Sequence, residues 1–398
     1  MIEIKSFEAG KGDAFLISFG EDKETQKHII IDMGFGTTYD TYIKSKLENL
    51  KRKVIDLLVI THIDADHING ALKFIQENGK FHKIIRVNEV WHNSYRHLQF
   101  SKEKKLKISD EEISYLNSII NSNLPKNEET GCSDISSYKN GSSFARYLYE
   151  YKYNWNTQFN KKAIFVENAV VSKQIEDINI IILSPNQNKL DGLAENWLDE
   201  LEDKKYNFTI SNEEIFDDAF EFYNMYNKTS DSNYSSISGS NDLNFEELAK
   251  IESKDGSATN GSSIAFILEY KRKKLLFLGD AHEDIVYTNL NKLKSNGYDL
   301  NFELVKLSHH GSNENLSNRL LALIESKRFL ISTEGIYYNH PHIEAISKIV
   351  MKKTNYTKKI IFNYDLVIIS ILNNAIINDT ENRYNHKAMY LQKVVIDD

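Results

Sequence analysis

The chain has 398 residues and a net charge of −8. Its residues are 41% hydrophobic and 27% charged, a composition that is typical of a globular protein with a sizeable core. The negative charge argues against a broad basic surface that wraps duplex DNA, although bound metal ions would supply positive charge at a local phosphate site. The single cysteine, Cys132, excludes an intrachain disulfide and a thiolate cluster, so any metal must be held by nitrogen and oxygen ligands.

No apolar run approaches the roughly 18 residues that a membrane-spanning helix needs. The first residues also lack the basic and then apolar layout of a signal peptide. We therefore expect a cytoplasmic protein without a membrane partner.

The first hundred residues predict short strands and then an α/β unit. Apolar runs are separated by glycine-rich or polar turns, which is typical of strands. A helix is predicted at residues 71–78 and ends at Gly79. The strands are expected at residues 2–7, 14–19, 28–31, 54–60 and 84–91.

Residues 61–70, directly after the strand at 54–60, contain two histidines and two aspartates. In an extended chain the side chains of residues 62, 64 and 66 point to one side, and residue 67 follows at once. Imidazole and carboxylate are ligands that divalent metals take. The stretch therefore predicts a metal site, and the alternative is a polar turn that caps a helix. The candidate ligands are His62, Asp64, Asp66 and His67.

The chain is expected to form a single domain over residues 1–398, with an insertion at residues 100–258. The first part, residues 100–175, predicts aromatic-rich helices, and residues 178–185 predict a strand. Residues 186–258 are acidic and rich in asparagine and serine, which indicates a lid, an interaction surface or disorder.

Strand patterns resume after the insertion and again deliver polar residues at their ends. Asp280 follows an apolar run and a glycine, which lets the backbone approach a ligand closely. His309 and His310 follow a third apolar run, and His340 lies in a later loop that we expect at the same rim. The strands are expected at residues 263–269, 274–278, 304–307, 329–332 and 360–371, with a helix near residues 343–351.

Other polar residues are weaker candidates. Hydroxyl and amide groups before the strand at 263–269 either contact a substrate oxyanion or form a turn with a strand cap. His92, after Trp91, is a candidate extra ligand, although single histidines at strand ends are usually structural. The candidate substrate contacts are Asn260, Ser262, Ser263 and Ser312.

Seven stretches in this order resemble the metallo-β-lactamase superfamily, and in particular the hydrolase domain of ComEC-type competence proteins and its stand-alone soluble relatives. The resemblance implies the α/β class and an αβ/βα four-layer sandwich, with a metal site on one edge between two sheets and the helical and polar insertion outside it. The matching stretches are residues 10–14, 31–34, 61–70, 260–264, 278–281, 308–312 and 339–342.

The resemblance implies two metal ions. His62 and Asp64 would hold one, Asp66 and His67 the other, and Asp280 would bridge them. The superfamily's commonest form has histidine at the position of Asp64. An oxygen ligand there favours Mn²⁺, while Zn²⁺ remains an alternative.

The resemblance also implies roles around the metals. His309 would be a late ligand or a proton donor, and His310 and His340 are the other candidates for that role. Asp32 would steady the ligand loop from behind. A Pro-Gly-His-Thr segment, which supplies a histidine in lactonases and thioesterases of this superfamily, is missing, so those substrates are less expected.

The predicted activity is metal-dependent phosphodiester hydrolysis, most simply by a nuclease that acts on DNA through a metal-activated hydroxide. Asp66 or Asp280 would orient the hydroxide, and one of the later histidines would protonate the leaving oxygen. One alternative is a phosphodiesterase for small cyclic or modified nucleotides, with residues 186–258 as a lid. Another is a hydrolase effector or regulatory subunit of a multi-protein assembly, such as a bacterial defence system, with the insertion at 100–258 as the partner surface.

Overall fold

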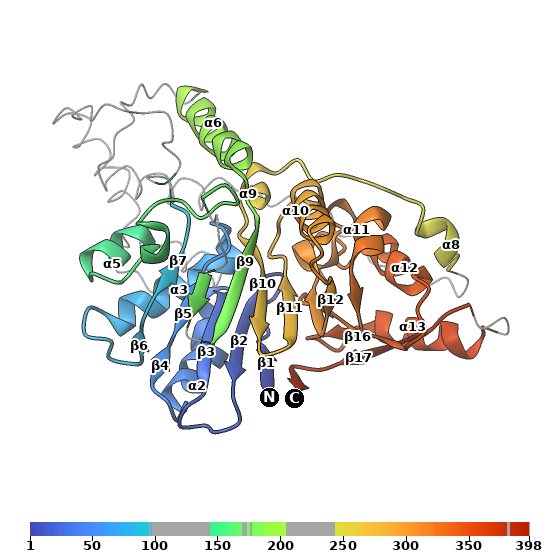
Figure 1. Cartoon of the computed structure of the whole chain (residues 1–398), viewed down its shortest axis with the longest axis horizontal. Coiled ribbons are helices and arrows are strands. Elements are labelled where there is room, and N and C mark those ends of the chain that lie inside the picture. Colours follow the sequence, from blue (N-terminus) through green and yellow to red (C-terminus); the bar gives the residue numbers. More distant parts are fainter. Residues whose placement is uncertain are drawn as a thin grey trace, which may run out of the picture.

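Two β-sheets lie face to face at the centre of the computed structural model, and helices cover their outer faces (Figure 1). Cys132 and most of the expected aromatic and polar insertion lie outside the described residues. Among the described residues, no helix is both long enough and apolar enough to cross a membrane. The structure describes residues 1–94, 97, 144–168, 173–175, 177–203, 243–379 and 383–397.

The first sheet has six strands in the order β18-β1-β2-β3-β5-β7. The pairs β18–β1, β1–β2 and β2–β3 are antiparallel, whereas β3, β5 and β7 are parallel. The carboxyl ends of these three parallel strands therefore meet at one edge. The strands are β1 (Ile2–Ser6), β2 (Ala14–Phe19), β3 (Lys27–Met33), β5 (Leu57–Val59), β7 (Val90–Trp91) and β18 (Lys393–Ile396).

The second sheet has eight strands in the order β17-β16-β15-β13-β11-β10-β9-β8. Strands β11, β13, β15, β16 and β17 are parallel, and β8, β9 and β10 pair antiparallel. The strands are β8 (Lys173–Ile175), β9 (Ile178–Ser184), β10 (Ala265–Tyr270), β11 (Lys273–Phe277), β13 (Leu304–Lys306), β15 (Arg328–Ile331), β16 (Lys358–Phe362) and β17 (His386–Tyr390). Two short pairs join β4 (Val54–Ile55) to β6 (Arg86–Val87) and β12 (Asn301–Phe302) to β14 (Glu325–Ser326).

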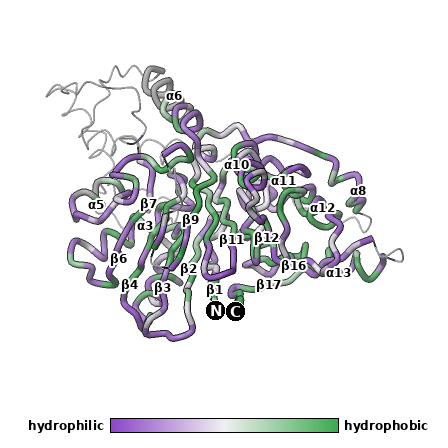
Figure 2. Tube along the Cα trace, viewed as in Figure 1, coloured by the Kyte–Doolittle hydropathy of each residue, from purple (hydrophilic) through white to green (hydrophobic). Residues whose placement is uncertain are grey.

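Three hydrophobic layers hold these elements together. Side chains alternate along each strand, so Phe266 and Leu268 of β10 face the other sheet while Ile267 faces the outer helices. The inner layer joins the two sheets, and an outer layer lies between each sheet and its helices. The hydropathy trace shows apolar segments in the interior and polar ones toward the outside (Figure 2). The expected αβ/βα four-layer sandwich is therefore confirmed.

The helices divide between the two outer faces. Those against the first sheet are α1 (Gly36–Thr38), η1 (Tyr39–Ile43), α2 (Lys44–Glu48), α3 (Ala65–Asn78) and α5 (Phe144–Glu150). Those against the second are α8 (Phe245–Leu248), α10 (Glu283–Ser295), α11 (Asn318–Leu323), α12 (Ile343–Met351) and α13 (Val367–Ile377). Shorter turns and the remaining helices are η4 (Thr157–Phe159), α6 (Gln187–Asp203), α9 (Ala258–Gly261), η5 (Ser308–Gly311) and η6 (Asn313–Asn315).

The structure corrects one expected strand and adds detail to two segments of the expected insertion. The strand predicted at 360–371 ends at Phe362, and Val367–Ile377 is helical, because an apolar run alone does not distinguish a strand from a buried helix. The polar segment 186–258 begins with helix α6. The strand expected at 178–185 is β9, which lies inside the large sheet between β8 and β10 and so is part of the core.

Candidate metal centre

The candidate site lies where strands of both sheets end. Strand β5 leads into the loop before helix α3, and Asp64 is extended at the N-cap of that helix. Asp280 follows β11 through Gly279, whose backbone has a φ of +50°. A Cβ at Gly279 would lie 2.5 Å from the Ser263 hydroxyl oxygen, so this close approach requires glycine.

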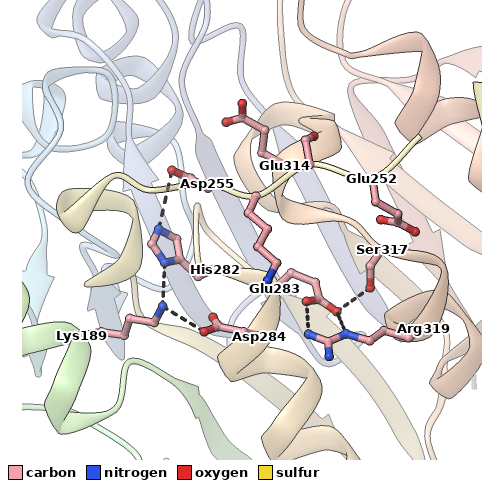
Figure 3. A pocket seen from close by; sticks show the side chains of 11 residues that line it. Lys189, Glu252, Asp255, His282, Glu283, Asp284, Glu314, Ser317 and Arg319 are labelled. Atoms are coloured by element: carbon pink, nitrogen blue, oxygen red, sulfur yellow. Dashed lines mark hydrogen bonds and ion pairs between the residues drawn. The ribbon is translucent and has the colours of Figure 1, made fainter. Parts of the chain in front are cut away.

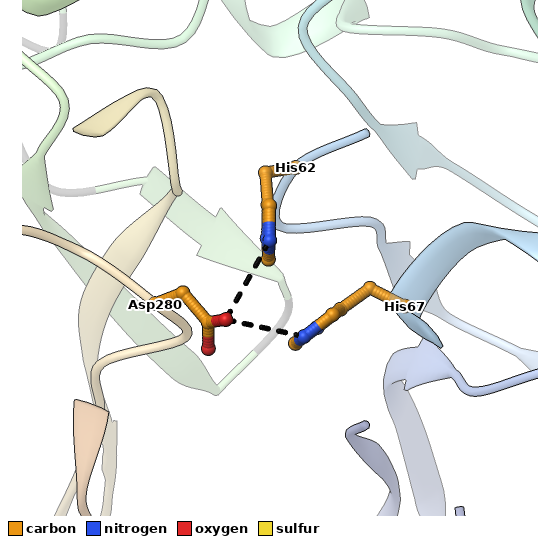
Figure 4. A group of neighbouring side chains, drawn as sticks. All are labelled: His62, His67 and Asp280. Atoms are coloured by element: carbon orange, nitrogen blue, oxygen red, sulfur yellow. Dashed lines mark ion pairs between the residues drawn. The ribbon is translucent and has the colours of Figure 1, made fainter. Parts of the chain in front are cut away.

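Three imidazole rings surround the Asp280 carboxylate. Its Oδ2 atom lies 3.7 Å from His62 Nε2, 3.4 Å from His67 Nε2 and 3.5 Å from His310 Nε2. Figure 4 shows His62, in the loop after β5, and His67, in helix α3, pointing toward Asp280, in the loop after β11. All four side chains are buried. The site therefore joins the two sheets, as the order of the motifs predicts.

Each ring is oriented through its other nitrogen. His67 Nδ1 lies 2.8 Å from Asp32 Oδ2, and His310 Nδ1 lies 2.9 Å from the Ser332 carbonyl oxygen. His62 Nδ1 lies 3.0 Å from the Thr61 hydroxyl. A proton on Nδ1 of His67 and His310 would satisfy these acceptors and leave each Nε2 lone pair directed toward Asp280.

Asp32 supports this arrangement from behind the ligand loop. Its carboxylate accepts hydrogen bonds from the Thr61 backbone N–H and the Thr61 hydroxyl, both at 2.7 Å. The Asp32 backbone has a φ of +52°, and His309 and His310 also have positive φ values of 46° and 55°. Such conformations cost energy for residues with a Cβ, and they concentrate at functional sites.

The polar atoms that face the centre lack hydrogen-bond partners. A buried polar atom without a partner costs stability, so a set of them around one point is typical of a cation-binding site. The atoms are His62 Nε2, His67 Nε2, His310 Nε2, Asp280 Oδ1 and Asp13 Oδ1. These donors fit a divalent metal.

The donor atoms fall into overlapping groups whose members lie within 4.8 Å of one another. One group comprises His62, His67 and Asp280, and another comprises Asp66, His67 and His310. Asp280 and His310 form a third group with Asp13. His67, His310 and Asp280 each belong to more than one of these groups, so the donors form one connected cluster.

The close packing of charged groups shifts their pKa values. Burial alone would raise the pKa of Asp280, but His67, His310 and His309 hold it well below its usual range. Burial lowers the pKa of His310, yet Asp280 and Asp13 outweigh this effect and raise the pKa to about 9. Shifts of this kind concentrate at functional sites.

The structure adds two residues that sequence reasoning did not select. Asp13 is buried and forms an ion pair with Lys306, which also donates to the Gly279 carbonyl oxygen at 3.2 Å. Asp13 Oδ1 lies 3.4 Å from His310 Nδ1. Burial would raise the pKa of Asp13, but Lys306 and His310 lower it to about 2. The sequence feature that could have indicated this pair is Lys306 itself, a lone lysine within the apolar strand β13.

His309 lies beside the donor groups described above but belongs to none of them. Its Nδ1 atom is 3.1 Å from Asn315 Oδ1 and 3.5 Å from Asp255 Oδ2, and its ring centre is 4.7 Å from that of His340. The structure therefore places His310 against Asp280 and places His309 and His340 at the adjoining rim. Asp64 Oδ2 lies 3.5 Å from His62 Nε2 and is also outside the three donor groups described above.

The expected substrate contacts mostly support other residues. Ser263 Oγ accepts a hydrogen bond from the Asp280 backbone N–H at 3.0 Å, and Asn260 Nδ2 donates to Asp255 at 2.8 Å. Ser262 donates to the Thr259 carbonyl, and Ser312 caps η6. His92, the weaker candidate for an extra ligand, packs against the rings of Phe144 and Trp155.

An acidic cavity of about 410 Å³ is lined in part by Asp255 (Figure 3), whose Oδ2 atom also lies 3.5 Å from His309 Nδ1 at the rim of the centre. Two of its cations are already paired, Arg319 with Glu283 and Lys189 with Asp284. Five carboxylates line the cavity, against three lysine and arginine side chains. The cavity is therefore poorly suited to a polyanion.

Replacing Gly12 by alanine is expected to disturb the ligand loop. A Cβ at this position would lie 1.8 Å from the Asp66 carbonyl oxygen, so the loop must move. We expect a loss of about 1–3 kcal/mol in unfolding free energy, together with weaker metal binding. Urea unfolding and metal titration measure both effects. Gly192→Ala is the control, because nothing lies within 4 Å of its Cβ position; equal behaviour of the two variants would contradict the prediction.

A family model described as the metallo-beta-lactamase superfamily matches residues 9–131. The matched residues include Asp13, Asp32 and the complete 61–70 loop. Together with the two-sheet architecture, the match shows that the chain has the metallo-β-lactamase fold. The fold and the clustered donors indicate a metal-dependent enzyme.

Two solved structures cover 98% of this chain at low similarity. The metallo-beta-lactamase fold protein YhfI from Bacillus subtilis has 7% identity and a TM-score of 0.34, with 95% of its own chain covered. CmlA, a diiron beta-hydroxylase from Streptomyces venezuelae, has 8% identity and a TM-score of 0.37, with 53% of its chain covered. A search of curated protein sequences gave no significant match. The resemblance to ComEC-type hydrolases stays a prediction.

Proposed function

We propose that this chain, with its metallo-β-lactamase fold, is a metal-dependent phosphodiester hydrolase that acts as a nuclease. The observation that carries the proposal is the convergence of three imidazole Nε2 atoms on the buried Asp280 carboxylate, with Asp66 and Asp13 beside them. This donor set combines nitrogen with several carboxylate oxygens. Such a set suits Mn²⁺ as well as Zn²⁺, and the oxygen-rich side favours Mn²⁺.

The residues divide into two groups of ligands. His62, His67 and Asp280 would hold one ion, and Asp66 and His310 would hold a second beside it. Bound metal ions lower the pKa of a water molecule and polarise a phosphoryl oxygen. Asp280, which lies between the rings of both sheets, would fix the spacing of the two groups.

The histidines at the rim of the centre are candidates to protonate the leaving oxygen. His309 and His340 lie next to the donor groups, with their ring centres 4.7 Å apart. His309 is the better placed to protonate the leaving oxygen, because Asn315 and Asp255 hold its Nδ1 side and its side chain is 22% exposed. We therefore assign metal binding to His310 and proton donation to His309, with His340 packed beside it.

An assay with linear single-stranded DNA, linear duplex DNA and cyclic dinucleotides, each with Mn²⁺, tests the proposal. The wild type is expected to cleave DNA, chelation with EDTA to abolish cleavage, and Asp66→Ala to lower it at least 100-fold. Equal activity of wild type and Asp66→Ala would exclude the site. Turnover of cyclic dinucleotides without DNA cleavage would instead assign a small-nucleotide phosphodiesterase.

A further inference from the structure

Three consecutive large apolar side chains are exposed beside the metal centre. Ile336, Tyr337 and Tyr338 follow strand β15, and 55%, 38% and 46% of their surfaces are exposed. Single exposed apolar residues need no explanation, but a contiguous group at the rim of a site does. We call these three residues, together with Lys11, the aromatic platform.

Lys11 completes the platform from the other sheet. Its Nζ atom lies 5.6 Å from the ring centre of Tyr337 and 5.0 Å from that of Tyr338. Lys11 stands two residues before Asp13, in the loop that contacts the backbone of Asp66. The platform thus combines two aromatic rings with one cation next to the proposed ligands.

A chain of rings connects the platform to the centre. The ring centres of Tyr338 and His340 are 6.0 Å apart, and those of His340 and His310 are also 6.0 Å apart. His340 further lies 4.7 Å from His309, the proposed proton donor. The platform is therefore within reach of a nucleotide next to the phosphate that is cleaved.

The loop that presents the rings is held in an unusual conformation. Tyr338 and Asn339 both have a φ of +55°, which is uncommon for residues with a Cβ. His342 Nε2 lies 3.1 Å from the Tyr338 carbonyl oxygen, and the His340 N–H donates to the Tyr337 carbonyl at 3.2 Å. A fixed loop presents the two rings without a large ordering cost on binding.

The charges around the platform favour binding of a nucleic acid by base stacking over binding by electrostatic attraction of its phosphates. Lys11 is the cation over the two rings, and Glu334 lies nearby, where burial raises the pKa of its carboxyl although Lys11 opposes this effect. The cavity on the Asp255 side is acidic, which disfavours a path for the phosphate backbone in that direction. Aromatic rings bind unpaired bases because every base has a flat face, whereas bases in a duplex are already stacked.

We propose that the aromatic platform stacks an unpaired base of a single-stranded nucleic acid while the neighbouring phosphate lies at the metal centre. This inference rests on the proposed phosphodiesterase function and adds the form of its substrate. It assigns substrate recognition to Tyr337 and Tyr338 and a phosphate contact to Lys11.

The test compares two fluorescein-labelled strands of equal length and charge, an oligothymidine and an abasic strand, by fluorescence anisotropy on the full chain in EDTA. We expect the wild type to bind the oligothymidine about 5- to 150-fold more tightly. The Tyr337→Ala/Tyr338→Ala variant should lose this preference, and Tyr337→Phe/Tyr338→Phe should keep it. Lys11→Ala should weaken binding of both strands equally.

Phe81→Ala is the matched control, because Phe81 is 81% exposed just beyond the far end of helix α3. It should bind like the wild type. The platform is excluded if the wild type shows no base preference, or if the double alanine variant retains it. Since binding is measured without cleavage, the Mn²⁺ cleavage assay reports separately on the proposed function.

Discussion

Replacing Asp280 by asparagine is expected to abolish metal binding and to lower kcat/KM for DNA by more than about 100-fold. Mutation of a residue that only orients a metal ligand typically lowers metal affinity or activity 10- to 100-fold. Mutation of a ligand that belongs to two donor groups should therefore lower them further. The amide keeps the size of the carboxylate but removes its charge, which is what balances His67, His310 and His309. The folded structure should persist, because the side chain volume is unchanged.

Thermal unfolding with added Mn²⁺ separates this effect from misfolding. Metal that binds only the folded protein raises its Tm, so the EDTA-treated wild type should show an upward shift and Asp280→Asn should show none. Asp299→Asn is the control, because Asp299 pairs with Lys274 at the opposite edge of the sheet and its side chain is 62% exposed. A full metal shift and full activity in Asp280→Asn would rule out this cluster as the metal centre.

The centre was largely predictable because its residues follow buried strands. When an apolar strand is followed by a carboxylate or an imidazole, that group lies at the edge of the sheet. Two such strands, one in each sheet, therefore supply the two sets of side chains that form the centre. His62, His67 and Asp280 are brought together in this way. The choice between His309 and His310 was not predictable, since consecutive left-handed backbone conformations give the two rings different partners.

Residues whose partners come from distant segments gave only a weak sequence signal, such as the lone Lys306 in an apolar strand. Asp13 follows two glycines and reads as a turn, yet it is buried against Lys306 of the other sheet. Asp255 lies in a polar stretch, and its burial depends on His282 and His309 from later loops. Charged residues of this kind are visible only after the fold has paired them.

Helix α6 shows a second limit of pattern reading. Its composition is acidic and polar, which suggested a lid or loop. Leu190 and Leu193 are nevertheless buried three residues apart, on one face of the helix. Two apolar residues are a weak helical pattern, and the surrounding charges concealed it.

Replacing Lys306 by methionine is expected to reduce the unfolding free energy by about 3–5 kcal/mol. Lys306 is 1% exposed, and its ammonium group is the nearest cation to the buried Asp13 carboxylate. Methionine fills a similar volume but leaves the Asp13 charge without this partner. A buried charge that loses its partner costs far more than the pair itself contributes.

A double-mutant cycle measured by urea unfolding tests this coupling. Adding Asp13→Asn to Lys306→Met removes the unbalanced carboxylate, so the double variant should be more stable than Lys306→Met alone. Lys274→Met is the control, because its pair with the exposed Asp299 should contribute no more than about 1 kcal/mol. If Lys306→Met cost as little as Lys274→Met, or if the losses simply added, the two charges would be independent. The expected coupling would show that Lys306 neutralises Asp13 across the two sheets and so holds the Asp13 loop against His310.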